Sequence, residues 1–205
     1  MPGSSWRRFG RPLSFSVVVL GAGSSSRLGQ PKQLLEYRNK PLLQTAVDTA
    51  HASAATQVIV AIGGSAPEVR TAVDFGDAAV VDNVHFTTGC SSSIISAMEV
   101  IDERCDGFIL MLADQPGVTR ASVDALAETA AQLPLGVCRY EDGIAHPFWF
   151  HRSVFGDLAD LHGDKGVWKL IESGRHPVAE LTCAGTIPPD VDTWDDYERL
   201  IASDQ

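Results

Sequence analysis

Apolar runs alternate with segments of helical periodicity along this chain. Five runs have the composition of strands buried on both faces of a parallel sheet, at 17–20, 57–62, 79–81, 108–112 and 135–138. Four segments between them place apolar residues on one helical face, at 41–50, 66–73, 91–101 and 122–132. This alternation predicts an α/β domain with a mostly parallel sheet.

The pattern changes after Tyr140. A turn at 141–143 and the aromatic run 148–150 predict a hairpin or an antiparallel edge strand. The last predicted elements are helices at 154–161 and 167–172, a strand at 178–181 and a helix at 195–202. Since no repeat or low-complexity linker interrupts the chain, we expect a single domain over 15–205, preceded by a mobile extension over 1–14.

The first apolar run, which ends at Leu20, leads into a loop of small residues. Small side chains in this loop allow a polyanion to approach the backbone, whose N–H groups bind phosphate oxygens. The loop residues are Gly21, Ala22, Gly23, Ser24 and Ser25. Arg27 and Lys32 add two cations to the same loop. A strand, a small-residue loop and two cations predict a nucleotide phosphate site. The alternative is a glycine-rich turn without a ligand, which would not need both cations.

Two common nucleotide motifs do not fit this loop. A dinucleotide fingerprint requires glycine where Ser26 stands and an acidic residue after the next strand, which ends instead in Gly63 and Gly64. A P-loop requires Lys-Ser or Lys-Thr after its last glycine, but Gln30 and Pro31 follow Gly29. The loop therefore matches neither of these two motifs.

Asp114 follows the buried run 108–112, so we expect it at the same sheet edge as the small-residue loop. A carboxylate there suits Mg²⁺, which prefers hard oxygen ligands and usually retains phosphates and waters. The alternative is that Asp114 caps a turn before Pro116.

Composition narrows the classes of partner. The 205 residues are enough for one domain with a sizeable core, and the formal net charge of −10 argues against nucleic acid or an anionic membrane. An anionic substrate must therefore be bound by local cations. Four cysteines without metal-type spacing favour a reduced, cytoplasmic protein. The apolar run at 15–20 is too short for a secretion signal, and no segment has the length of a membrane span.

Several motifs resemble those of the nucleotidyltransferases that act on molybdenum cofactor. LGAGSSSRLGQPK at 20–32 is similar to the family signature L-A-A-G-x-S-x-R-M-G-x-x-K, and Asp114-Gln115-Pro116 is similar to its Asp-x-Pro motif. Further similar segments follow in order: Asn83 with 89–93, HPF at 146–148, GDKG at 163–166 and DVDT at 190–193. The resemblance is strongest to the subgroup called MobA-related proteins, and it implies a three-layer Rossmann-like nucleotidyltransferase fold.

The resemblance also implies roles for individual residues. Arg27, Lys32 and Asp114 would be catalytic, with Asp114 binding Mg²⁺ and Asp192 as a second ligand. Residues 20–25, Asn83 and Ser92 would bind the nucleotide, and Gln115, His146 and Asp164 would lie near the acceptor. Structural alternatives remain: Ser91 as a helix N-cap, His146 as a packed histidine, and Thr193 as part of a helix start.

Three departures from the family pattern bear on specificity. Gly21 replaces a common alanine, Val167-Trp168 replaces a small residue and an arginine, and Trp194 replaces a common proline. The lost arginine removes a cation that would bind the acceptor's phosphate, which puts the identity of the acceptor in question.

The resulting hypothesis is transfer of CMP from CTP to a phosphorylated pterin, molybdenum cofactor, with release of pyrophosphate and a molybdoenzyme as partner. Ala22 matches the cytidylyl type of loop, and its methyl group narrows the space for a base, which favours CTP over GTP. The alternatives are another acceptor such as a sugar phosphate, a nucleotide-binding protein without turnover, and, last, a nicotinamide-dependent reductase.

Overall fold

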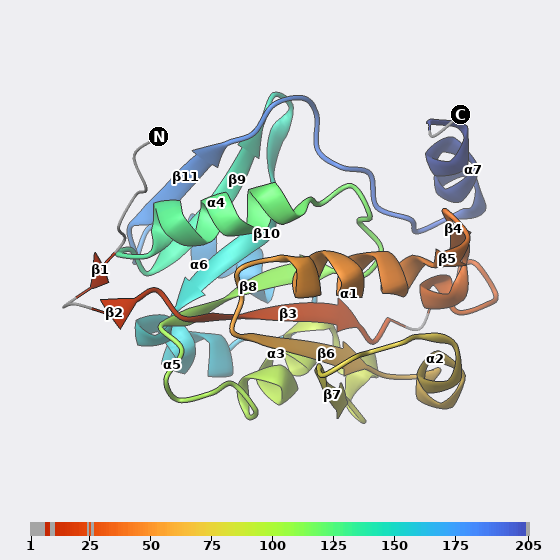
Figure 1. The fold of residues 1–205 in the computed structure, drawn as a ribbon, viewed down its shortest axis with the longest axis horizontal. Coiled ribbons are helices and arrows are strands. Elements are labelled where there is room, and N and C mark those ends of the chain that lie inside the picture. Colours follow the sequence, from red (N-terminus) through yellow and green to blue (C-terminus); the bar gives the residue numbers. More distant parts are fainter. Residues whose placement is uncertain (1–6, 9–10, 24, 26, 204–205) are drawn as a thin grey trace.

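The computed structural model describes residues 7–8, 11–23, 25 and 27–203. Its centre is a seven-stranded sheet with the strand order β11-β9-β10-β8-β3-β6-β7 (Figure 1). The strands are β3 (Phe15–Gly21), β6 (Gln57–Ile62), β7 (Ala79–Asp82), β8 (Gly107–Leu112), β9 (Leu135–Tyr140), β10 (Gly143–His151) and β11 (Val178–Thr182).

The sheet is mostly parallel, as predicted, and β10 runs antiparallel to both of its neighbours, β8 and β9. A hairpin or an antiparallel edge strand was expected here: β9 and β10 form the hairpin, but β10 lies inside the sheet and not at its edge. The aromatic run explains this position. Phe148, Trp149 and Phe150 are all completely buried, and their side chains alternate between the two faces, so both faces must be covered.

Helices cover both faces of the sheet and make three layers. Val17 and Val19 of β3 pack with α1 (Leu42–Ala52) and α4 (Arg120–Ala130) on one face. Val18 and Leu20 point the other way, toward α3 (Cys90–Met98), α5 (Phe155–Ala159) and α6 (Gly166–Glu172). The three-layer α/β fold is thereby confirmed, with the core divided by the sheet (Figure 1).

A small third cluster lies beside the main core. The hairpin of β4 (Glu36–Tyr37) and β5 (Lys40–Pro41) packs against α7 (Trp194–Ser203), as Figure 1 shows. Leu35, Val191 and Leu200 are among its buried residues. This packing fixes the segment just before α7, which carries Asp192. The remaining elements are short: α2 (Ala66–Ala72) and the 3₁₀ helices η1 (Lys32–Leu34), η2 (Phe86–Thr88) and η3 (Arg152–Val154).

Within the predicted N-terminal extension, β1 (Arg7–Arg8) pairs with β2 (Arg11–Pro12). Residues 1–6 and 9–10 lie outside the described part of the chain, so the mobility of 1–14 stays a prediction, as does the single-domain boundary. Among the described residues, no helix combines the length and apolar character needed to cross a bilayer.

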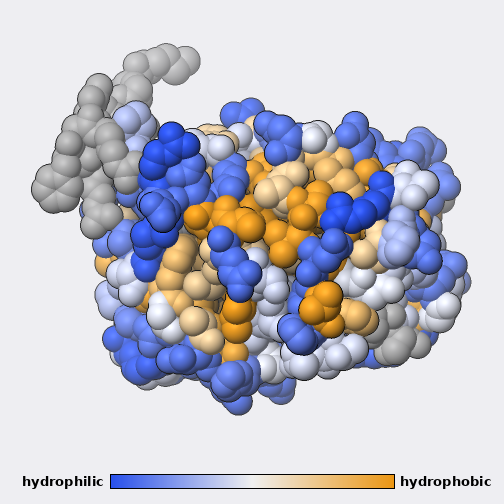
Figure 2. Space-filling view, turned by 90° about the horizontal axis from the view of Figure 1, so that it is seen from below, coloured by the Kyte–Doolittle hydropathy of each residue, from blue (hydrophilic) through white to orange (hydrophobic). Residues whose placement is uncertain are grey.

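One face of the molecule gathers hydrophobic residues at its centre within a hydrophilic rim (Figure 2). It is the side on which α3 and β7 lie in Figure 1. Val80 and Val81 of β7 and Ile95 and Met98 of α3 are half-buried. The edge strand β7 has only four residues, and a short edge strand limits pairing with other chains.

Gly107 provides a test of the position of β10 inside the sheet. A Cβ at Gly107 would collide with the carbonyl oxygen of Phe150 and lie 2.9 Å from the Cα of His151. We therefore expect Gly107→Ala to destabilise the protein by about 1–3 kcal/mol in urea unfolding. The control is Gly156→Ala in α5, where nothing lies within 4 Å and a small stabilisation is expected. Equal stability of the two variants would contradict this packing.

Candidate functional site

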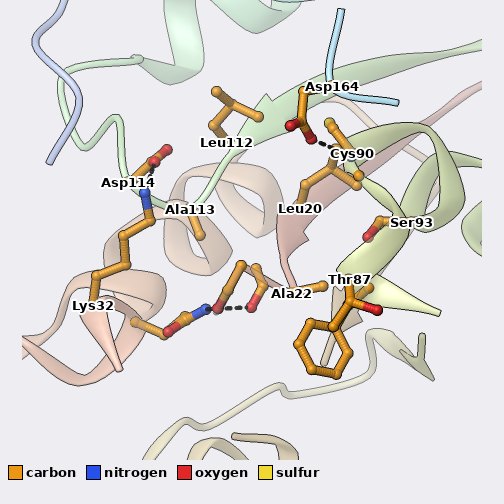
Figure 3. A pocket seen from close by; sticks show the side chains of 15 residues that line it. Leu20, Ala22, Lys32, Thr87, Cys90, Ser93, Leu112, Ala113, Asp114 and Asp164 are labelled. Atoms are coloured by element: carbon orange, nitrogen blue, oxygen red, sulfur yellow. Dashed lines mark hydrogen bonds and ion pairs between the residues drawn. The ribbon is translucent and has the colours of Figure 1, made fainter. Parts of the chain in front are cut away.

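A cavity of about 310 Å³ lies at the carboxyl ends of β3 and β8 (Figure 3). Its walls come from four parts of the chain, which are 20–23 with Lys32 and Gln33, the segment that contributes Phe86, Thr87, Gly89, Cys90 and Ser93, residues 112–114, and Asp164. Figure 3 shows Lys32 and Asp114 on one side and Thr87 and Ser93 on the opposite side. The predicted nucleotide residues Leu20, Gly21, Ala22 and Gly23 all line this cavity, whereas Ser24 lies outside the described residues.

The buried side chain of Gln33 holds the small-residue loop in shape. Its amide nitrogen donates to the carbonyl oxygens of Gly21 at 2.7 Å and Gly23 at 2.9 Å. Ser25 adopts a φ of 53°, donates to the amide oxygen of Gln33, and accepts from the backbone N–H of Lys32 at 2.9 Å. Sequence reasoning missed Gln33; its one signal is a glutamine directly before two leucines.

Lys32 lies between two carboxylates. Its Nζ is 2.5 Å from Oδ2 of Asp114 and 2.8 Å from Oδ1 of Asp192. Arg27 contacts the other oxygen of Asp192 at 3.0 Å, but it is largely exposed and does not line the cavity. The structure thus brings together four predicted site residues from three distant segments of the sequence.

Backbone contacts place the two carboxylates side by side. Asp114 follows β8, and its carbonyl oxygen accepts a hydrogen bond from the N–H of Val191 at 3.1 Å. Asp196 accepts from the N–H groups of Asp192 and Thr193, which fixes the turn into α7. The alternative reading of Thr193 as a helix start therefore fits its geometry, since its hydroxyl accepts from the N–H of Asp196.

Burial and neighbouring charges shift the pKa values of Lys32 and Asp114 in opposite directions; with Asp192 these residues form an ion triad. Burial tends to lower the pKa of Lys32, but the carboxylates of Asp114 and Asp192 outweigh it and raise that pKa. Burial raises the pKa of Asp114 against the opposing effect of the Lys32 ammonium. The hydrogen bond from Lys32 lowers the pKa of Asp192, which is more exposed.

The donor set of this site fits a hard divalent cation. Asp114 and Asp192 direct carboxylate oxygens at one point, and Mg²⁺ is commonly held by one or two carboxylates together with phosphates and waters. Within the described ranges, no group of three or more His, Cys, Asp or Glu side chains gathers for a metal. The described residues thus supply two carboxylates to such a cation, and other oxygen donors would complete its ligand set.

The segments 89–93 and 163–166 are joined by hydrogen bonds and close backbone packing. Oδ1 of Asp164 accepts from the N–H of Cys90 at 2.9 Å, and the Ser91 hydroxyl donates to the carbonyl oxygen of Gly163 at 2.6 Å. Gly89 has a φ of 110°, and a Cβ there would lie 2.8 Å from Gly163. Asp164 lines the cavity, and its carboxylate also fixes the start of α3.

Cys90 places a thiol in the cavity that sequence reasoning did not assign. Burial and the nearby carboxylates of Asp164 and Asp114 raise its pKa to about 11, so the sulfur stays protonated.

Asn83 and Ser92 do not line the cavity. Asn83 is 2% exposed, and its amide nitrogen donates to the hydroxyls of Ser92 and Ser93, both at 2.8 Å. Its amide oxygen accepts from the N–H of His85. That Asn83 and Ser92 read the base stays a prediction; in this structure the polar atoms of Asn83 hold the segment 83–93.

Gln115 and His146, expected near the acceptor, also lie outside the cavity wall. Gln115 is 6% exposed, and its amide nitrogen donates to the carbonyl oxygen of Pro188 at 3.4 Å. The His146 ring packs on the Phe148 ring with their centroids 4.2 Å apart, and the centroids of Phe148 and Trp168 are 5.2 Å apart. For His146 the geometry favours the packed histidine over an acceptor ligand.

Residues 17–179 match the family described as the MobA-like NTP transferase domain. The crystal structure of Rv0371c from Mycobacterium tuberculosis H37Rv is 47% identical, with a TM-score of 0.88, over 93% of this chain and 98% of that one. A structure of Rv0371c in complex with manganese is 45% identical, with a TM-score of 0.84, over 94% of this chain and 100% of that one.

Curated relatives carry different activities. Nicotine blue oxidoreductase of Paenarthrobacter nicotinovorans is 29% identical over 90% of this chain and 95% of its own. The bifunctional protein GlmU of Cupriavidus pinatubonensis is 29% identical over 62% of this chain, which spans only 28% of GlmU. A structure of CMP:2-keto-3-deoxy-manno-octonic acid synthetase with CTP covers 94% of this chain and 98% of its own; at 17% identity and a TM-score of 0.74 it shows a shared fold alone.

The buried position of His146 predicts acid sensitivity. Burial lowers its pKa from 6.5 to about 3, so the unfolded chain takes up a proton at this side chain before the folded chain does. The stability that neutral His146 contributes is therefore present above pH 6.5 and is lost as the pH falls toward 3. We expect His146→Gln to lose less stability than wild type between pH 7 and 5 in urea unfolding, by on the order of 1 kcal/mol.

The exposed Val84 supplies the control for this measurement. Val84→Ala changes no titratable group and should show the same pH dependence as wild type. A His146→Gln variant with unchanged pH dependence would contradict the protonation state argued for His146.

Proposed function

We propose that this chain, which belongs to the MobA-like NTP transferase domain family, transfers a nucleoside monophosphate from a nucleoside triphosphate to a phosphorylated acceptor. An oxygen of the acceptor's phosphate attacks the α-phosphorus, the bond from that phosphorus to the bridging oxygen of the β-phosphate breaks, and pyrophosphate leaves. This reaction requires no protein nucleophile, so positioning and charge stabilisation provide most of the rate.

The ion triad of Lys32, Asp114 and Asp192 carries this proposal, because it lies against the small-residue loop in the cavity. A plain glycine-rich turn has no need of a buried lysine held between two carboxylates.

Each side chain has a defined task in the proposed reaction. The ammonium of Lys32 stabilises charge on the triphosphate as the bridging oxygen departs. Arg27, at the exposed rim, contributes a second positive charge. Gln33 keeps the carbonyl oxygens of Gly21 and Gly23 turned toward itself, and thus away from the incoming phosphates.

The manganese complex of Rv0371c supports a divalent cation in this chain as well, and we propose Mg²⁺. Asp114 and Asp192 would hold it. When bound, such an ion neutralises phosphate charge and polarises the phosphorus–oxygen bonds.

The acceptor is proposed from the family resemblance. Molybdenum cofactor, a phosphorylated pterin, is our first candidate, with a molybdoenzyme as recipient, and a sugar phosphate is the alternative. Trp168 stands where the family has an arginine and packs on Phe148, so the chain lacks that cation for the acceptor. We place the protein in the cytoplasm, which agrees with four unpaired cysteines.

A second candidate function is reduction with a nicotinamide cofactor, favoured by the nearly full-length match to nicotine blue oxidoreductase. The loop lacks the dinucleotide fingerprint, and the segment after β6 supplies glycines instead of an acidic residue. Titration with NADH decides between the two: binding of NADH without pyrophosphate release from any triphosphate would support the reductase.

Pyrophosphate release tests the transferase directly. With Mg²⁺, CTP and molybdenum cofactor or a sugar phosphate, we expect release by wild type and a loss of at least about 100-fold in Asp114→Asn and Lys32→Ala. Arg27→Lys should lose activity because a point charge replaces the fork. The loss should be smaller than in the other two variants, since Arg27 and its partner Asp192 are exposed. No release with any acceptor would refute the transferase, and unchanged kinetics in the variants would remove these residues from the site.

The base preference provides a separate test. Ala22 is 5% exposed and lines the cavity, and its methyl group leaves less room beside the loop for a purine than a glycine would. We expect CTP to compete more strongly than GTP in wild type, and Ala22→Gly to reduce the gap. A wild-type preference for GTP would overturn the cytidylyl assignment while leaving nucleotidyl transfer intact.

A further inference from the structure

Lys32 occupies a position that suits a metal ion. Its Nζ lies 2.5 Å and 2.8 Å from oxygens of Asp114 and Asp192, and Mg²⁺ binds oxygens at about 2.1 Å. A cation at this point would therefore need only a small inward shift of the two carboxylates. The ammonium and a divalent ion cannot both fill the same space.

We propose that Lys32 acts as an internal substitute for the metal, filling the space between Asp114 and Asp192 until a triphosphate draws its ammonium away. The inference rests on the proposed function, since it takes the triphosphate as ligand. It gives Lys32 a second task before the reaction: it keeps the two carboxylates neutralised and blocks tight metal binding in the absence of nucleotide.

Charge and burial explain why the position must be filled. The side chains of Lys32 and Asp114 are only 16% and 14% exposed. The buried carboxylate of Asp114 and the carboxylate of Asp192, which is 40% exposed, repel each other unless a cation separates them. Arg27 does not perform this task, because it contacts Asp192 alone and its side chain is 68% exposed.

The course of the lysine side chain provides the route for exchange. A Cβ built on Gly23 would lie 3.9 Å from Cε of Lys32, so the end of the lysine passes directly beside the small-residue loop. Rotation about the last side-chain bonds is enough to turn the ammonium from the carboxylates toward phosphates held by that loop.

This exchange couples the two ligands. The triphosphate removes the ammonium from the carboxylate pair and brings its own oxygens to complete the ligand set of the metal. Nucleotide and metal then increase each other's affinity, as any linked pair of sites must.

Manganese binding without nucleotide tests the proposal on the full chain. Mn²⁺ is titrated into metal-free protein, and free Mn²⁺ is measured by electron paramagnetic resonance. We expect Lys32→Met, which is similar in length but neutral, to bind Mn²⁺ at least tenfold more tightly than wild type. Arg27→Met removes the same charge from Asp192 without vacating the position, and it should change the affinity by less than threefold.

Two outcomes of this titration would overturn the proposal: no gain in Lys32→Met, or an equal gain in Arg27→Met, which would indicate a general charge effect. If metal-free Lys32→Met is unfolded, Mn²⁺ should restore its circular dichroism, and failure to do so also counts against the proposal.

The ¹⁵N resonance of the Lys32 ammonium in wild type, assigned by its loss in the variant, reports the exchange itself. It should move with CTP alone and stay in place with millimolar Mg²⁺ alone. A shift with Mg²⁺ as large as that with CTP would refute the exchange.

These measurements do not involve turnover, so the two proposals fail separately. Pyrophosphate release by wild type together with unchanged Mn²⁺ affinity in Lys32→Met would refute the exchange alone. Tighter Mn²⁺ binding in the variant without pyrophosphate release under any condition would refute the transferase alone.

Discussion

The parallel pairing of β3 with β8 is the constraint on which the site depends. Its register sets Leu20 beside Leu112, so the small-residue loop and Asp114 leave the sheet at the same edge. The third segment arrives by a different means, because the cluster around α7 holds Val191 buried and its N–H bonds to the carbonyl of Asp114. Sheet register and one packed helix thus bring together charges that lie up to 165 residues apart in the sequence.

Much of the fold and part of the site could be predicted from the sequence because hydrophobic periodicity reports burial directly. The run 57–62 forms β6 with the expected bounds, and Asp114 lies where a residue after a buried strand must lie. The position of β10 inside the sheet was not predictable in this way, since an aromatic run reveals that a strand is buried but not which strands flank it. The structure supplied that order.

Side-chain direction explains the other differences. Asn83 and Gln33 are both amides near the site, and their residue types alone do not distinguish a ligand contact from a structural one. In the structure, Gln33 donates to backbone carbonyl oxygens and Asn83 donates to serine hydroxyls. The cavity wall on the side of Thr87 and Ser93 is formed by residues whose types alone do not indicate a site. Motif resemblance selects whole segments, and it does not show which side chains of a segment face the cavity: within 83–93 the lining residues include Thr87 and Ser93 and not Asn83.

The mutual hold of segments 89–93 and 163–166 has a consequence for interpreting genetic variation in this chain. Because Gly89 and Gly163 pack backbone to backbone, and Ser91 and Asp164 bond across the same contact, neither segment can change alone. A deleterious substitution in one should be rescued by a compensating change in the other, and hybrid proteins should exchange both segments together. The two segments are therefore expected to co-vary, although 69 residues separate the end of the first from the start of the second.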